Sequence, residues 1–397
     1  MGLLGTALAL PPPGSSSAGV ARCSSNGSLR APDGRGPSRL WSGGLHAGDL
    51  QHNGCHGDGS PVVGIHAVWW RASCLLLITV LPWAKLLAAP PAGSLALIQE
   101  RGTPLPSGRV TGGTQVPLER AEGGDTPVLT FHSDRGSVRL LLDTGAASAM
   151  VSPALVRRLG LESRPLSRDQ FSLAGGGDTC AHRPLSKTRL PELRLAAGTS
   201  QRLSLRLQGV QAFVLPVVAL PQGIDGVLGA ATLKQVPFGV DPHKGRVFFG
   251  GPALQWRMQM PPRPDVIPLL WRRGVPLGGI RVRSGSDGKI KQWNSLIDTG
   301  AEGLFLPPEV AAQLRPLGTG QAARLVGVCG QQQVWRQRLM GIGMGPQAPP
   351  IQTHEAILTT NPVFALLGVE AIVGQELLRF RGQLWRLDTD PPRLELW

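Results

Sequence analysis

Tyrosine is absent from this chain of 397 residues, and the usual signatures of hydrolytic metal or serine sites are absent as well. The five cysteines show no paired Cys-x-x-Cys spacing. No two histidines four residues apart enclose a glutamate, and no G-x-S-x-G elbow stands between a strand and a helix pattern. These absences exclude the common zinc and serine hydrolase patterns, and we expect neither a metal nor a cofactor.

Acidic residues are also scarce, since 26 Asp and Glu face 40 Lys and Arg, which gives a formal charge of +14. No dense basic run is interleaved with aromatic residues, so the sequence predicts no nucleic-acid partner. The excess is typical of a solvated basic surface, which would tolerate an acidic partner or an anionic membrane face.

The first quarter of the chain lacks the apolar periodicity of a folded domain. Residues 1–60 are rich in Gly, Ser, Pro and His, and we predict that they are disordered or an untranslated leader. Residues 61–89 hold the compact apolar run Ala72–Ala84 and small residues after it, as a secretory signal does. We expect export (periplasmic, secreted or membrane-anchored); a buried segment or a signal anchor, which would associate with a membrane, stays open. Residues 90–124 predict a linker or pro-segment.

One pattern occurs twice in the rest of the chain. Residues 140–151 read LLLDTGAASAMV and residues 295–306 read SLIDTGAEGLFL, so that an apolar strand runs into Asp-Thr-Gly-Ala each time. Asp and Gly are ordinary turn residues, and one copy would predict only a surface turn. Two copies, 155 positions apart and each on an apolar strand, favour a functional pair.

Further matches follow in the same order after each copy, which predicts a tandem duplication. The matched pieces are a helix start, a Gly-containing hairpin tip, an apolar-apolar-Gly strand and a final Asp-to-Arg hairpin: Ser152-Pro153 with Pro307-Pro308, Phe171–Gly175 with Arg324–Gly330, Val227–Gly229 with Ile372–Gly374, and Val240–Val247 with Leu387–Leu394. The halves are residues 125–250 and 264–397, and residues 251–263 are a linker.

This order of parts resembles the retropepsin-like aspartic proteases, from residue 125 to the end. The resemblance implies an all-β, bilobal acid-protease fold, made of two retropepsin-like β-barrel halves with a short helix each. It implies that each apolar-apolar-Gly strand passes beside its Asp-Thr-Gly turn in a ψ-shaped loop. Retropepsins are homodimers, so two fused units predict a monomer with an internal pseudo-dimer.

The resemblance also assigns roles. Asp143 and Asp298 would be the catalytic pair, and the support and substrate-binding positions would be Thr144, Gly145, Ala146, Thr299, Gly300 and Ala301. The flap tips would be Gly175, Gly176, Gly177, Gly327 and Gly330, which gives two flaps. Cys180 and Cys329 lie at or just after these tips; a bridge between them would clamp the cleft, and whether they pair stays open. The absence of tyrosine departs from pepsin's flap. Retroviral enzymes often bind substrate backbone through acids soon after the Ala, and Glu302 keeps such an acid whereas Ala147-Ser148 does not.

The chemistry explains the pairing. Two carboxyl groups held close together share one proton, so the charged member can take a proton from water while the neutral member protonates a peptide carbonyl. The sequence therefore predicts an aspartic endopeptidase acting on a protein or peptide. The alternatives are a non-catalytic peptide-binding module and a structural protein with two plain turns. Four other repeated acids are expected to cap turns or meet Arg246 and Arg393: Asp225, Asp241, Glu370 and Asp388. The natural substrate, its cleavage specificity, the signal cleavage site and self-processing stay open.

Overall fold

The computed structural model describes residues 4–6, 92–94, 96–175, 184–196, 204–216, 220–327, 330–346, 348–350 and 352–397. The signal-like segment 61–89 lies outside this set, and so does all but 4–6 of the predicted disordered leader. Gly176, Gly177, Cys180 and Cys329 also lie outside it, so the proposed bridge is untested.

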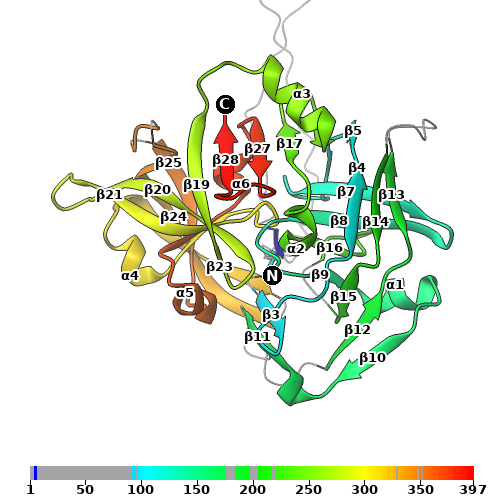
Figure 1. The fold of residues 1–397 in the computed structure, drawn as a ribbon. Coiled ribbons are helices and arrows are strands. Elements are labelled where there is room, and N and C mark those ends of the chain that lie inside the picture. Colours follow the sequence, from blue (N-terminus) through cyan, green and yellow to red (C-terminus); the bar gives the residue numbers. More distant parts are fainter. Residues whose placement is uncertain are drawn as a thin grey trace, which may run out of the picture. The chain divides into compact units, whose positions relative to one another are not determined.

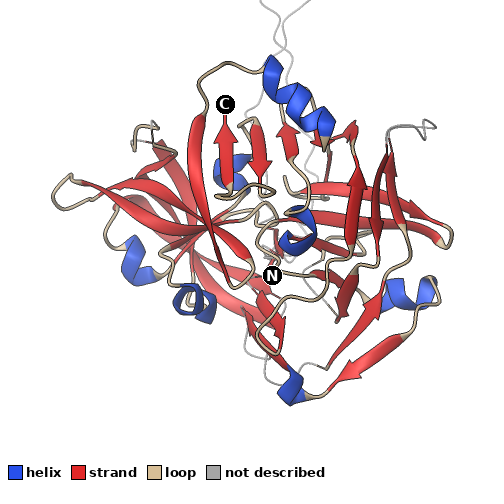
Figure 2. Ribbon diagram, viewed as in Figure 1, coloured by secondary structure: helices blue, strands red, loops and turns tan. Residues whose placement is uncertain are grey.

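The described part of the chain is mostly β-strand, with short helices at a few turns (Figure 2), which confirms the all-β prediction. The first half contributes strands β7 (Pro127–Ser133), β8 (Gly136–Asp143), β9 (Ala149–Val151), β10 (Ser163–Leu166), β11 (Phe171–Gly175), β12 (Leu185–Arg189), β13 (Leu193–Ala196), β14 (Ser204–Gln208), β15 (Gln211–Val214), β16 (Gly226–Gly229), β17 (Phe238–Asp241) and β18 (Arg246–Phe249). Its helices are α1 (Pro153–Arg158), α2 (Ala230–Leu233) and the 3-10 turn Arg168–Gln170.

The second half is also mostly β-strand. Its strands are β19 (Asp265–Arg272), β20 (Val275–Arg283), β21 (Ile290–Ile297), β22 (Leu304–Leu306), β23 (Arg315–Gly327), β24 (Gly330–Met344), β25 (Gln352–Leu358), β26 (Ala371–Val373), β27 (Gln383–Arg386) and β28 (Arg393–Leu396). Its helices are α4 (Pro308–Ala311), α5 (Pro362–Leu367) and α6 (Gln375–Leu378).

Each half threads one strand between the two arms of its Asp-Thr-Gly turn. In the first half β16 runs parallel to β8, with Leu228 opposite Leu142, and antiparallel to β9. In the second half β26 runs parallel to β21, with Ile372 opposite Leu296, and antiparallel to β22. These are the two ψ-shaped loops that the apolar-apolar-Gly segments predict, and they are buried throughout.

The final hairpins of the two halves join in one sheet. β17 pairs with β27 in antiparallel register, with Phe238 opposite Trp385, and these two rings stack with centroids 5.7 Å apart. Figure 1 shows β17, β27 and β28 side by side near the C-terminus. Large aromatic side chains buried on both strands favour this pairing, because each removes much apolar surface from water. The shared sheet therefore joins the two halves.

The helix after the first Asp-Thr-Gly motif begins where the sequence predicts it. The side chain of Ser152 caps it by accepting the backbone N–H of Leu155 at 3.2 Å, and Pro153 starts its first turn. Leu155 and Val156 face the core. In the second half α4 begins at Pro308, as expected, but ends after four residues at Ala311.

Two stretches expected to be linkers carry regular structure. Residues 96–124 form β3 (Ala96–Glu100), β4 (Arg109–Gly112), β5 (Thr114–Pro117) and β6 (Glu119–Arg120), while β1 (Leu4–Thr6) and β2 (Ala92–Ser94) lie before them. β4, β5 and β6 pair with β14, β18 and β7, so backbone pairing and not side-chain pattern orders this stretch. Residues 251–259 form α3 (Gly251–Gln259), because Trp256 buries its ring against Phe248.

Candidate active site

The structure brings the two Asp-Thr-Gly-Ala turns together. Asp143 ends β8 and Asp298 follows β21, and both carboxyl groups are completely buried. The backbone N–H of Gly145 reaches across to donate to Asp298 Oδ1 at 3.2 Å, and Gly300 donates to the same oxygen at 2.8 Å. Asp143 Oδ1 accepts the N–H of Ala146 at 2.9 Å.

The two threonines lock the turns by reciprocal hydrogen bonds. The N–H of Thr144 donates to Thr299 Oγ1 and the N–H of Thr299 donates to Thr144 Oγ1, both at 3.0 Å. Each hydroxyl then donates to the carbonyl that precedes the opposite aspartate, that of Ile297 at 2.9 Å and that of Leu142 at 2.7 Å. All four bonds are buried, so they fix the separation and angle of the turns.

Only glycine fits the third position of either turn. A Cβ on Gly145 would overlap the carboxyl group of Asp298, and a Cβ on Gly300 would overlap that of Asp143. The close crossing of the two backbones therefore requires both glycines. Ala146 and Ala301 are fully buried and lie in one contiguous apolar cluster.

Burial dominates the electrostatics of the pair. It raises the pKa of Asp143 from 3.8 to about 6, and it raises the pKa of Asp298 well above its ordinary value, with the charge of Asp143 as the next cause. Within the described residues, neither Asp143 Oδ2 nor Asp298 Oδ2 has a hydrogen-bond partner. Because the two groups titrate as a unit, the proton belongs to the pair. The pair therefore retains a proton at a pH where an exposed aspartate has lost it.

The residue just before each threaded strand is an acid that binds the strand leading into the Asp-Thr-Gly turn. Asp225 Oδ2 accepts the backbone N–H of Arg139 at 2.9 Å, and Glu370 Oε2 accepts that of Asn294 at 2.8 Å, so equivalent acids hold equivalent positions of β8 and β21. The structural role expected for these acids agrees with this geometry, but their partners differ from those expected. Asp225 pairs with Arg158 rather than Arg246.

The other two repeated acids also serve structure. Asp241 caps its turn by accepting the N–H groups of His243 and Lys244, and it accepts Trp256 Nε1 at 3.1 Å. Asp388 pairs with Arg386, whereas the expected partner Arg393 pairs with Glu395.

Glu302 does not face an open groove, contrary to what the resemblance implies for substrate binding. It is 8% exposed, and its two oxygens accept the backbone N–H groups of Asp125 and Thr126, both at 2.7 Å, together with the Thr126 hydroxyl. The Glu302 carboxyl group therefore binds the backbone of residues 125 and 126, just before β7 of the first half. Burial raises its pKa above 4.5 despite these donors.

The expected flap segments differ between the halves. In the second half β23 and β24 form one long hairpin whose last pair is Gly327 with Gly330. In the first half Gly175 ends β11, which pairs with β3 from the N-terminal region, with Phe171 opposite Glu100. That partner could not be predicted from the sequence, because Ala96–Glu100 is short and its apolar pattern is weak.

Sequence reasoning also missed three polar anchors of the turns. Gln375 Nε2 donates to the carbonyl of Thr299 at 2.7 Å, and Ser148 Oγ accepts the N–H of Leu105 at 2.9 Å. The third anchor is the bond pair from Glu302 to residues 125 and 126. Gln375 alone had a usable signal, since it directly follows Ile-Val-Gly in the sequence.

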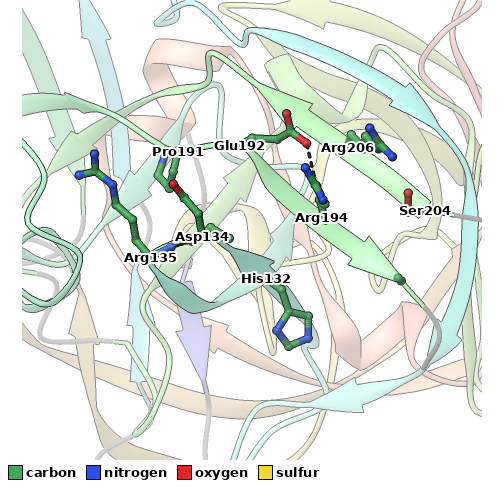
Figure 3. Close-up of a pocket in the computed structure, with 10 residues that line it drawn as sticks. His132, Asp134, Arg135, Pro191, Glu192, Arg194, Ser204 and Arg206 are labelled. Atoms are coloured by element: carbon green, nitrogen blue, oxygen red, sulfur yellow. Dashed lines mark hydrogen bonds and ion pairs between the residues drawn. The ribbon is translucent and has the colours of Figure 1, made fainter. Parts of the chain in front are cut away.

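A surface pocket of about 900 Å³ lies on the first half, apart from the paired turns (Figure 3). Its walls come from the β7–β8 turn and from β13 and β14, and they carry both charges, with Glu192 and Arg194 paired at 2.8 Å. No residue of the two Asp-Thr-Gly-Ala turns lines it. Among the described residues, no cluster of His, Cys, Asp and Glu could hold a metal ion. The same residues include no helix that is both long and apolar enough to span a membrane.

Comparison with known protein families gives a match that covers the first Asp-Thr-Gly-Ala turn. The family model described as aspartyl protease matches residues 129–232, which include Asp143 and β16. No curated protein matches the sequence significantly. The chain is similar in structure to basic 7S globulin from soybean, with 12% identity and a TM-score of 0.41, and to conglutin gamma, a basic 7S globulin from lupine seeds, with 12% identity and a TM-score of 0.39. Each likeness covers 72% of this chain and 94% of the other.

Proposed function

We propose that the chain is an aspartic endopeptidase whose catalytic pair is Asp143 and Asp298. The observation that carries the proposal is the pair of buried carboxyl groups on crossed turns, held by reciprocal threonine bonds. A pair of like charges is costly to bury, and a merely structural turn has no need of it. The aspartyl protease match over residues 129–232 supports the first half of the pair.

The pair would act through one shared proton. The ionised carboxyl group takes a proton from a water between the two groups, and the resulting hydroxide attacks the carbonyl carbon of the peptide. The protonated carboxyl group gives its proton to the carbonyl oxygen, so charge does not build up in the intermediate. Because the pKa of Asp298 is raised well above its ordinary value, the pair keeps this proton at a pH where an exposed aspartate has lost it.

Two further features complete the proposal. The repeated ψ-shaped loops and the equivalent bonds of Asp225 and Glu370 favour an origin by tandem duplication, with the molecule acting as a monomer and internal pseudo-dimer. We also propose export, on the evidence of the signal-like run in residues 61–89.

The test is cleavage of casein and of a peptide library between pH 3 and 7, with and without pepstatin. Both carboxyl groups are buried, so a substrate reaches them only if the apolar cluster around the turns opens. The assay therefore also includes the Ile98→Asp variant, whose added charge should open that cluster, which contains Ala146 and Ala301. We expect a bell-shaped pH dependence and inhibition by pepstatin. If neither the unmodified protein nor Ile98→Asp cleaves any substrate, the proposed endopeptidase activity is refuted. The peptide-binding module would then be the better account.

A further inference from the structure

The strand β3, from the N-terminal region, lies against the flap segment of the first half. It pairs in antiparallel register with β11, the flap segment of the first half, along five residues from Ala96 opposite Gly175 to Glu100 opposite Phe171. Just before it, β2 pairs with the flap strand β23 of the second half, with Ala92 opposite Val326. One short stretch of chain thus contacts both flap segments.

The side chains of β3 are enclosed rather than exposed. Leu97 is 3% exposed and Ile98 is fully buried, and both belong to the apolar cluster that contains Ala146, Ala301 and the flap residue Leu325. A strand that only covered a sheet edge would leave one face to solvent. This strand instead belongs to an apolar cluster that also includes residues of a flap strand and of both Asp-Thr-Gly-Ala turns.

Polar contacts fix the register of the strand. Gln99 Nε2 donates to the carbonyl of Arg273 in the second half at 3.1 Å. Glu100 accepts Lys187 Nζ of the first half at 2.6 and 2.8 Å, and both side chains of this ion pair are about three-quarters buried. Further along, Leu105 donates its N–H to Ser148 Oγ, five residues after Asp143. The segment is therefore anchored in both halves and beside the first catalytic turn.

We infer that residues 96–100 occupy the peptide-binding groove in cis, and that the groove selects extended peptides with two adjacent apolar residues followed two positions later by an acid. The inference rests on the proposed function for the identity of the groove. Main-chain pairing with the flap accounts for affinity, and enclosed side-chain positions account for selectivity, as in other cases of strand addition. Lys187 is the specificity-determining residue for the acid.

Binding tests the inference without turnover. The probe is a fluorescent peptide of residues 94–102, added to Asp298→Asn and to Asp298→Asn with Ile98→Asp, so that neither protein cleaves it. Because apparent affinity scales with the fraction of open grooves, the double variant is expected to bind the probe at least about tenfold more tightly. Asp298→Asn with Leu270→Asp is the matched control, since Leu270 is 55% exposed, and it should bind like the single variant.

A charge exchange tests the selectivity. In the double variant, a probe with Lys in place of Glu100 should bind about threefold to fivefold more weakly, and Lys187→Glu should restore it while weakening the original probe. Equal binding of both probes would overturn the assigned role of Lys187.

Two further readouts separate the possible failures. Hydrogen exchange in the amides of β11 should speed up in the Ile98→Asp variant. If that variant does not fold, a cleavage site for an unrelated protease is inserted at the exposed Arg101-Gly102 turn instead. Cutting the chain there should open the groove. No probe binding by either opened protein would overturn the inference. Tight probe binding without peptide cleavage by the opened protein carrying Asp298 would uphold the inference and refute the proposed function.

Discussion

The two halves agree at their Asp-Thr-Gly-Ala turns and differ in what lies next to these turns. Each turn supplies a threonine to the other, and an acid just before each threaded strand binds the strand that leads into the turn. Four and five residues after the aspartates the halves diverge. Ser148 in the first half accepts Leu105, whereas Glu302 in the second half accepts residues 125 and 126. The N-terminal region breaks the symmetry, because the molecule has one such region and different residues of it contact the two halves.

The flap segments show the same contrast. In the second half β23 pairs mainly with β24, with Gly327 opposite Gly330, and meets β2 only at Val326, whereas β11 of the first half pairs with β3 along five residues. Where two groups must act jointly the halves match, and where they receive the N-terminal arm they do not. The predictions below test that division, beginning with the largest effect.

Changing either aspartate tests whether the matched turns act as one unit. Asp143→Asn and Asp298→Asn should each lower kcat/KM by about 10⁴-fold or more, and the double variant should be little worse, because members of a catalytic unit are not additive. Peptide turnover by purified variants measures this. Asp388→Asn is the control, since that residue pairs with Arg386 at the surface. Substantial activity in one single variant would make the halves functionally unequal.

Removing one threonine hydroxyl should destabilise the protein equally from either side. Thr144→Val leaves the N–H of Thr299 and the carbonyl of Ile297 buried without partners, and Thr299→Val does the same on the other side. Each change should cost roughly 2–5 kcal/mol in the free energy of unfolding. Urea unfolding measures it.

The control for the threonine pair is Thr130→Val, because Thr130 has only a 3.3 Å bond to Glu119 near the surface. It should shift the free energy by no more than about 0.5 kcal/mol. A much larger cost for one threonine of the pair than for the other would show that the turns are not equivalent.

The buried carboxyl pair should make the protein less stable as pH rises. A pKa raised on folding means that the folded state holds protons that the unfolded state has released, so stability falls between about pH 4 and 6. For Asp143, the rise from 3.8 to about 6 corresponds to a loss on the order of 3 kcal/mol. Asp298 shifts in the same direction and extends the window upward.

Urea midpoints at pH 4, 5, 6 and 7 measure this loss in the unmodified protein and in the double Asp→Asn variant. The variant should gain stability relative to the unmodified protein as pH rises, because it has no carboxyl group to ionise in the pair. The reverse trend would mean that the pair is ionised below its ordinary pKa, and the shared-proton mechanism would fail.

The helix that follows each turn offers the smallest test. Ser152→Ala should cost about 1 kcal/mol, because the N–H of Leu155 loses its cap, while Ser152→Thr should retain most of the stability. The second half has no such side-chain bond, since Pro307 precedes α4. Thermal unfolding measures the pair of variants, and equal losses from Ala and Thr would show that packing rather than capping sets the effect.

Local chemistry was readable from the sequence because it depends on neighbours in the chain. The two Asp-Thr-Gly-Ala turns, the cap at Ser152 and the apolar strands Gly226–Gly229 and Ala371–Val373 follow from residue type and spacing. Their order resembles that of the retropepsin-like proteases, and this resemblance implied the ψ-shaped loops and the meeting of the two aspartates. The structure of each of these elements depends on its own local sequence and not on which part of the molecule it contacts.

The tertiary structure alone decided the partners of the N-terminal region. Pairing of β3 with β11, burial of Ile98 and the bonds from Glu302 to residues 125 and 126 join positions far apart in the chain. A five-residue strand such as Ala96–Glu100 has too little pattern of its own to name its partner. Its place is set by the main-chain groups and apolar space that both halves present only after they have folded together.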